Sequence, residues 1–419
     1  MKRFLLVSLV VVFVLSFAGL SSATNGDNLI GVGPIARSMG GVGIAAPQDA
    51  LSAIFANPAA LCFGPYCPGS EVNVDATVFM PKANTRIQMP AYGIDTGGDR
   101  SESDFYVIPA LALSVPINEK LRFGFGAYGV SGLGVDYRKK FDLDPTPGTG
   151  HQDMYTDLSI MKIAPNLAYM ITPNLSVGAS LHINMGVLDL QHRDGTSTGW
   201  ALGGQVGAIY KNGPVSLGLV YVTPQKVKHK GVADFDLDGS TDTLALESPQ
   251  SVGVGVAVEP IQNVLLVELD VKWINWADAI GYRDFGWRDQ WNFAVGTQYK
   301  PTSKLALRVG YNYAKSPIKA HSWTDFDGFI DVQGKDVPRT NYEILRISGF
   351  PAIVEHHVTA GIGYEFTKNV SLNIGYMHAF KNTIEEKGTA VHPVFGVSSA
   401  SVRSDLYEDS IDFGLTYRF

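Results

Sequence analysis

Residues 410–419, SIDFGLTYRF, show the alternation that decides the fold. Every second side chain from Ile411 to Phe419 is apolar, and the side chains between them are small, polar or charged. A period of two residues is that of a β-strand, whose successive side chains point to opposite faces. One apolar and one polar face are typical of a strand in an outer-membrane β-barrel. A soluble β-sandwich alternates in the same way, so this strand alone leaves both folds open.

Four further stretches repeat the alternation at about 9–11 residues, the length with which a tilted strand crosses a bilayer. They are residues 175–185, 265–273, 291–299 and 305–314. Six short connections contain turn-forming residues, at 116–119, 172–174, 211–214, 259–262, 300–303 and 367–369. Seven longer polar stretches lie between them, at 82–103, 136–157, 191–199, 225–247, 275–286, 316–352 and 382–405. This order predicts an all-β transmembrane fold, a 14-stranded antiparallel barrel with short periplasmic turns and long outer loops.

Residues 1–23 have the layout of a secretory signal peptide. Lys2 and Arg3 give a positive start, an apolar core follows, and Ser21-Ser22-Ala23 offers a cleavage site. An uncleaved anchor helix is the alternative, because the apolar run is long for a signal. We expect cleavage, and no later apolar run is long enough for a transmembrane helix.

Residues 25–60 do not fit the strand pattern. Five glycines from Gly31 to Gly43 would interrupt a strand, and the alanine-rich run that follows favours short helices and turns. A wide barrel would leak unless its lumen were occluded. We therefore predict a signal peptide at 1–23, an N-terminal hatch or plug in the lumen at 24–70, and the barrel at 71–419.

The composition argues against several classes of protein. Charged residues make up 17% of the chain and aromatic residues 11%, and 45 of 419 residues are glycine, which suits a barrel better than a soluble enzyme. A net charge of −7 argues against a nucleic-acid partner. No nucleophile-elbow or zinc-protease motif is present, so we expect neither enzymatic activity nor a catalytic cofactor.

With these features in place, the sequence resembles the FadL/TodX family of outer-membrane transporters for hydrophobic compounds. The resemblance rests on the N-terminus that ends in Asn57-Pro58-Ala59, on residues 271–318 and 356–380, and on the terminal FGLTYRF. It extends over essentially the whole chain after the signal. It implies a barrel with an N-terminal hatch, in which Asn57, Pro58 and Ala59 form the hatch motif. It also implies a monomer in the outer membrane of a Gram-negative bacterium.

The resemblance further implies a route: capture by outer loops, rearrangement of the hatch, and lateral release through a gap where the third strand is kinked. Here that strand is expected at residues 121–135, and its second half contains Gly129, Gly132 and Gly134. Glycine within a strand weakens pairing and permits a bulge, so these glycines are the candidates for the gap. The alternative is that they merely relieve crowding at the start of a loop.

Arg122, Arg308 and Arg418 fall on the lumenal face by alternation. They are candidates to bind the carboxylate head group of a ligand. The alternative is that they pair with lumenal acids such as Asp412 or Glu268.

Four tryptophans gather near one expected outer loop: Trp273, Trp276, Trp287 and Trp291. Tryptophan is enriched where a protein meets the membrane–water interface. We therefore interpret them as an aromatic girdle rather than a cage around a ligand.

Asp234, Asp236 and Asp238 have the D-x-D-x-D-G spacing of a calcium loop. A structural calcium ion is therefore a candidate. Position 12 of the loop would be Ala245, where such loops carry a glutamate, so a solvated acidic loop is the alternative.

Cys62 and Cys67 flank a Gly-Pro turn in a chain expected to be exported to an oxidising compartment. A local disulfide is the prediction, and two free thiols are the alternative. The pair is not a hallmark of the family.

The leading hypothesis is passive transport of a hydrophobic small molecule, either a long-chain fatty acid or an aromatic hydrocarbon. A general diffusion porin for small polar solutes is the alternative, and it predicts an inward-folded loop without a plug. An outer-membrane lipid hydrolase is a third possibility, for which no nucleophile and base stand out. The expected surroundings are outer-membrane lipid and lipopolysaccharide, and the terminal Phe419 is the expected signal for the barrel-assembly machinery.

Overall fold

A computed structural model describes residues 25–90, 93–138, 154–190, 196–236, 238–324, 328–392 and 396–419. The expected signal peptide lies outside these residues. The barrel strands, in chain order, are β1 (Glu71–Met89), β4 (Tyr106–Pro116), β5 (Leu121–Asp136), β6 (Tyr155–Thr172), β7 (Leu175–Asp189), β8 (Ser197–Asn212), β9 (Val215–Val222), β12 (Ser251–Ile261), β13 (Leu265–Ile274), β14 (Gln290–Tyr299), β15 (Leu305–Ala314), β19 (His356–Glu365), β20 (Val370–His392) and β21 (Gly396–Arg418).

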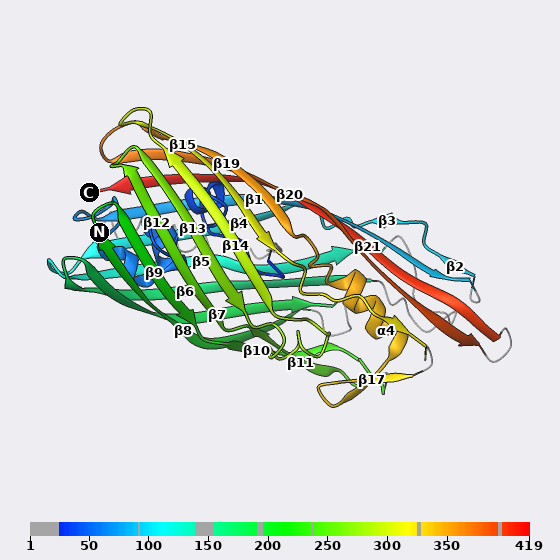
Figure 1. Cartoon of the computed structure of the whole chain (residues 1–419). Helices are drawn as coiled ribbons and strands as arrows, with labels where there is room; N and C mark the ends of the chain where they lie inside the picture. The colour runs from blue at the N-terminus through cyan, green and yellow to red at the C-terminus, as the bar shows by residue number, and fades with distance from the viewer. Residues whose placement is uncertain are drawn as a thin grey trace, which may run out of the picture.

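These strands form a closed antiparallel barrel (Figure 1). Each strand pairs with the next in the order given above, and β21 pairs with β1 from Glu71–Arg418 to Gln88–Ser401, which closes the ring. The predicted 14-stranded fold is therefore confirmed. None of the described helices is long and apolar enough to cross a membrane.

The alternation read from the last strand is confirmed in space. Phe413, Leu415 and Tyr417 are 44–48% exposed on the outer face, whereas Asp412 and Thr416, which alternate with them, are buried on the lumenal face. An apolar outer surface of this kind is stable only against lipid, because apolar area in water costs about 25 cal/mol per Å².

Two stretches expected to be loops are largely strand. Residues 82–89 continue β1, and most of residues 382–405 belongs to β20 and β21, so these strands extend well beyond the barrel body (Figure 1). Their side chains still alternate, with Lys82 and Arg86 outward and Ile87 inward. Polarity alone suggested loops here, whereas unbroken cross-strand pairing keeps the chain extended.

The remaining elements belong to the outer connections and to the N-terminus. The short strands are β2 (Ile94–Asp95), β3 (Asp99–Arg100), β10 (Gln225–Ala233), β11 (Asp242–Ser248), β16 (Ser322–Trp323), β17 (Phe329–Val332) and β18 (Lys335–Pro338). The helices are α2 (Pro34–Ser38), α3 (Ala50–Ala56), the 3-10 helix η1 (Pro58–Cys62), α4 (Arg339–Ile344) and the π-helix η3 (Leu345–Gly349). The β10–β11 hairpin contacts β7 and β8 and buries Val227 and His229.

The N-terminal segment, residues 25–70, contacts strands around the whole ring. Helix α2 touches β15, β19, β20 and β21, α3 touches β1, β4 and β5, and η1 touches β5 to β8. Figure 1 draws these blue helices within the ring of strands.

Local sequence explains the short helices of this segment. Asp49 caps α3 by accepting a hydrogen bond from Ser52 N at 2.9 Å, as N-cap aspartates do. Asn57 ends α3 and begins η1, and Pro58 occupies the first position of η1, where its missing N–H costs nothing.

Candidate functional site

Where the N-terminal segment approaches the barrel wall, the wall carries glycine. A Cβ atom at Gly178 would lie 2.4 Å from the backbone of Pro58 and Ala59, and one at Gly207 would lie 2.1 Å from Asn57 Oδ1. We use the name glycine belt for eight wall glycines at which an added Cβ would lie within 3.0 Å of the N-terminal segment: Gly178, Gly207, Gly218, Gly255, Gly296, Gly310, Gly361 and Gly414. The belt allows the segment's backbone to lie directly against the strands.

Lumenal carboxylates bind the backbone of the same segment. Glu268 accepts hydrogen bonds from the N–H groups of Ala45 and Ala46, at 2.7 and 3.0 Å. Asp270, two residues along β13, accepts two more from the preceding pair of residues, at 2.9 and 3.0 Å. Such bonds to a carboxylate are stronger than neutral ones, so β13 fixes this part of the segment.

An ion pair fixes α2 to β21. Nε of Arg37 lies 2.9 Å from Oδ1 of Asp412, and both side chains are fully buried. The same guanidinium donates to Ser410 Oγ at 2.7 Å. Asp412 and Glu268 therefore bind the N-terminal segment, and neither is the partner of the three predicted arginines.

The Asn57-Pro58-Ala59 motif lies at the junction of the segment with β7 and β8. The Asn57 amide donates to Ile44 O at 2.8 Å and to Ala208 O at 3.3 Å, and its oxygen accepts from Ala59 N at 3.1 Å. Ser176 Oγ donates to Ala59 O at 2.8 Å. Asn57 thus ties two turns of the segment to the wall.

The third barrel strand, β5, loses one neighbour half-way along. Its pairing with β4 ends at Tyr128, whereas its pairing with β6 continues to Asp136. The register against β6 shifts between Gly129 and Ser131, so Val130 forms a bulge. The stretch beyond Tyr128 therefore has an edge that β4 does not cover.

We call residues 129–135 the β5 window. The three predicted gap glycines lie within it: Gly129, Gly132 and Gly134. Residues 128–133 are all buried, so the alternation of exposed and buried side chains is lost along this part of β5. At the outer end, the N–H of Asp136 donates to Ser101 Oγ at 2.9 Å, which bounds the window.

The start of the N-terminal segment occupies the edge that β4 leaves. Leu29 N donates to Val130 O at 3.1 Å, and Gly132 N donates to Asp27 O at 3.1 Å. These two bonds are strand-like pairing across the window. The first described residues of the chain therefore cover the window from the inside.

An aromatic cluster holds this N-terminal stretch from the other side. The rings of Trp276, Tyr282 and Trp287 lie 4.6–4.9 Å apart and are buried. The Tyr282 hydroxyl donates to the carboxylate of Asp27. Burial raises the pKa of Asp27 to about 6, and the hydrogen bond from Tyr282 offsets part of this rise by stabilising the carboxylate.

This cluster corrects the interpretation of the tryptophans. Trp276 and Trp287 face the interior, so the girdle interpretation is wrong for both. Trp291 is 56% exposed on the outer face, as a girdle residue would be. Strand alternation could not place Trp276 and Trp287 on the outer or the inner face, because both belong to the loop between β13 and β14.

A small apolar cavity of about 20 Å³ lies beside the cluster and the window. Its lining comes from β5, β6, β11 and two outer loops: Leu133, Leu158, Leu246, Tyr282, Phe285, Trp287, Arg346 and Phe350. Its volume is roughly that of a single water molecule, so the cavity is too small for a hydrophobic ligand in this conformation.

The loop at 316–352 covers this cavity and is fastened by a buried charge cluster. Arg346 lies between Glu343 of α4 and Glu386 of β20, and His321 Nε2 lies 2.8 Å from Glu343 Oε1. Glu386 belongs to the extended part of β20, so the extension anchors the loop. Thr156 Oγ1 also donates to Gly349 O at 2.5 Å.

The three predicted head-group arginines all have protein partners. Arg122 donates to Gly69 O at 2.6 Å, and Arg308 donates to Gln298 Oε1 at 2.7 Å. Arg418 Nε lies 2.7 Å from Glu71 Oε2. The Arg418–Glu71 pair agrees with the alternative that these arginines pair with acids of the barrel wall. The three arginines have different partners, so they do not form one binding site.

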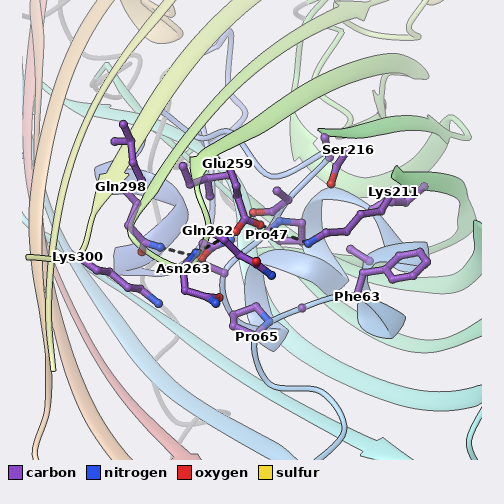
Figure 2. Close-up of a pocket in the computed structure, with 18 of the residues that line it drawn as sticks. Pro47, Phe63, Pro65, Lys211, Ser216, Glu259, Gln262, Asn263, Gln298 and Lys300 are labelled. Atoms are coloured by element: carbon purple, nitrogen blue, oxygen red, sulfur yellow. Dashed lines mark hydrogen bonds and ion pairs between the residues drawn. The ribbon is translucent and has the colours of Figure 1, made fainter. Parts of the chain in front are cut away.

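Arg308 and Arg418 also lie at the opposite end of the barrel from the apolar cavity. They line a space of about 30 Å³. Next to it, near the short turns, is a larger space of about 220 Å³, whose lining is drawn in Figure 2. The larger space is lined by polar side chains that include Lys211, Glu259 and Gln298, together with Pro47 and Phe63 of the segment. We interpret it as a polar vestibule below the segment.

The acidic loop is neutralised by a lysine. Asp236 and Asp242 lie 3.0 and 2.7 Å from Lys335 Nζ, and Asp234 accepts hydrogen bonds from backbone N–H groups within the loop. Asp238 is exposed and bonds Ser240 instead. Ligand atoms of Asp234, Asp236 and Asp242 lie within 4.8 Å of one another. A calcium ion there would have to displace the lysine ammonium, and the calcium site stays a prediction.

Cys62 and Cys67 are free thiols in the structure, so the predicted disulfide is not formed. Cys67 Sγ instead donates to Leu61 O at 3.0 Å. The hydrogen bond directs this sulfur toward the backbone of η1.

Comparison with known proteins agrees with this geometry. Residues 28–227 and 193–324 match the family model described as outer membrane protein transport protein (OMPP1/FadL/TodX). The chain belongs to this family. It is a multi-pass protein of the outer membrane.

Relatives match over nearly the whole chain. Outer membrane protein P1 of Haemophilus influenzae is 21% identical over 94% of this chain and 92% of its own length. The crystal structure of the Pseudomonas putida toluene transporter TodX has a TM-score of 0.65 at 20% identity, covering 93% of this chain and 99% of TodX. A Pseudomonas aeruginosa FadL homologue has a TM-score of 0.67 at 15% identity, covering 94% and 99%. At these identities the two structures support the fold.

Proposed function

We propose that this protein lets hydrophobic molecules cross the outer membrane passively, by way of the apolar cavity and the β5 window. A ligand enters between the outer loops, displaces the start of the N-terminal segment, and leaves sideways into lipid. The rest of the segment acts as the plug. This route keeps apolar surface away from water throughout, which avoids about 25 cal/mol per Å² of exposed area.

The observation that carries the proposal is the side-by-side position of the cavity and the window. Leu133 lines the cavity and also lies within the window. The start of the segment is joined to the window by two backbone hydrogen bonds, from Leu29 N to Val130 O and from Gly132 N to Asp27 O, and by a bridge between Asn28 and Ser131. Displacing a few residues would therefore connect an apolar pocket with the membrane.

The porin alternative receives limited support. The inward-folded β10–β11 hairpin is a feature that a porin would share. The N-terminal segment is a feature that a porin would lack, because it lies in the lumen against the glycine belt. Conductance for small polar solutes distinguishes the two functions.

Deleting Val130 tests the window. Without the bulge residue, β5 keeps one register along its whole length, and its second half can pair with β4. We expect uptake of labelled oleate and labelled toluene to fall to the level of cells without the protein. A Val130→Ala variant, which keeps the bulge, serves as the control.

Folding is checked by heat-dependent migration of the barrel in gels. Full uptake by the deletion variant would overturn lateral release through the window. Passage of small polar solutes through the wild type, with neither hydrophobic label entering, would replace the proposal by the porin function.

A further inference from the structure

The outer surface of β1 and β21 changes from apolar to charged at one height, below the point where these strands rise above the barrel body (Figure 1). On β1, the outward side chains from Val72 to Met80 are apolar, and those from Lys82 to Gln88 are polar or charged. On the adjacent β21, the change comes between Ile411 and Asp409. A hydrocarbon layer accepts only the apolar part, so the charged part lies among the lipid head groups and above them.

Two cations on the β20–β21 side of this charged surface share one carboxylate. Lys381 Nζ lies 3.0 Å from Asp405 Oδ2, and the Arg403 guanidinium donates to Asp405 Oδ1 at 3.3–3.4 Å. We call Lys381 and Arg403 the first cation pair; with one shared carboxylate, the group has a net charge of +1. A register shift in β20 exposes the consecutive residues Phe380 and Lys381, which places an apolar side chain directly beside a charged one.

Two further cations share a carboxylate on the β1–β3 side. Lys82 Nζ and Arg100 Nη2 lie 2.7 and 2.9 Å from Asp104 Oδ2. Arg100 is the cross-strand partner of Asn84, so it belongs to the same outward face as Lys82. We call Lys82 and Arg100 the second cation pair, which also has a net charge of +1 with its carboxylate. Strands β21 and β3 flank β1, so the two pairs are two strand spacings apart, about 10 Å.

Two arginines of this surface lie directly opposite each other. Arg86 of β1 is the cross-strand partner of Arg403 of β21, and both side chains are exposed. Like charges in this position are destabilising. Arg86 is offset by two hydrogen bonds to Asp95, at 2.9 and 3.0 Å, whereas Glu385 beside Arg403 already pairs with Lys387 at 3.2 Å. An anion bound at this surface would relieve the remaining repulsion.

We propose that the two cation pairs bind the two phosphate groups of lipid A, the phosphorylated glycolipid of the outer leaflet. Lipid A carries a phosphate at each end of a glucosamine disaccharide, so it offers one anion to each pair. Lysine and arginine form strong charge-assisted hydrogen bonds with phosphate. The acyl chains continue downward over Phe380 and the apolar part of β1. A free phosphate or a phospholipid with a single phosphate reaches only one pair. The inference is independent of the proposed transport.

Binding of diphosphoryl and monophosphoryl lipid A to the purified protein in detergent micelles, followed by native mass spectrometry, tests the proposal. We expect the wild type to bind the diphosphoryl form about tenfold more tightly, because only this form reaches both pairs. Removing either pair should reduce this preference to within about twofold. The two test variants are Lys381→Gln with Arg403→Gln, and Lys82→Gln with Arg100→Gln.

Lys304→Gln combined with Lys368→Gln is the matched control, because both are exposed lysines near the short turns at the other end of the barrel. It should retain the preference, and heat-dependent migration in gels checks that every variant is folded. A wild type without the preference, a preference retained in both test variants, or an equal loss in the control would overturn the site. Binding of inorganic phosphate or phosphatidylglycerol as tightly as diphosphoryl lipid A would overturn the assignment to the glycolipid.

Discussion

The N-terminal segment is held in two contrasting ways. Residues 31–62 lie against the glycine belt and receive a buried ion pair and several charged hydrogen bonds from the wall. Residues 25–29 are held by two backbone hydrogen bonds to β5 and by the Tyr282–Asp27 contact, among the described residues. Local opening therefore requires few bonds to break at residues 25–29 and many at residues 31–62. We infer that residues 25–29, the moving part, can open, and that residues 31–62, the seated part, stay in place.

The largest effect should come from breaking the buried ion pair of the seated part. Arg37→Met leaves Asp412 buried without its cation, which costs about 3–5 kcal/mol. We expect a lower unfolding midpoint in denaturant and a leak of small polar solutes through the loosened plug.

A second variant distinguishes lost charge balance from lost packing. Combining Arg37→Met with Asp412→Asn removes both charges and should recover part of the stability. If the single variant had the unfolding midpoint of the wild type and leaked no more small polar solute, the seated part would not depend on this contact.

The next effect concerns the moving part and depends on pH. The folded-state pKa of Asp27 is raised to about 6 by burial, against 3.8 for the free side chain. The protonated carboxyl is therefore favoured when the N-terminal stretch is docked. Docking is favoured below about pH 4 and becomes weaker as the pH rises through about 6, by on the order of 3 kcal/mol in total.

Protease cleavage or cysteine labelling near residue 28, measured from pH 4 to pH 8, follows this opening. We expect accessibility to rise with pH in the wild type. Asp27→Asn should remain docked with no dependence across that range. The same pH dependence in this variant would show that another group controls the N-terminal stretch.

The barrel could be predicted because its signal is local: alternation over about ten residues identifies a strand. The gap at the third strand was expected from the family resemblance, and its glycines lie in the β5 window. The seat of the segment could not be predicted, since the partners of Arg37 and Glu268 are more than two hundred residues away in sequence. Alternation places Arg308 on the lumenal face, but it gives neither the position of this residue along the barrel axis nor its hydrogen-bond partners.

The smallest effect should come from one hydrogen bond of the seated part. Ser176→Ala removes the bond from Ser176 Oγ to Ala59 O, which is worth about 1 kcal/mol. Because the segment keeps its ion pair and its other wall contacts, we expect a slightly lower unfolding midpoint and unchanged uptake of hydrophobic ligand. Tyr282→Phe also removes one hydroxyl, but one that donates to Asp27 of the moving part, so it should alter uptake. Equal effects of the two variants on uptake would mean that the seated part moves as well, and the contrast between the two parts would not hold.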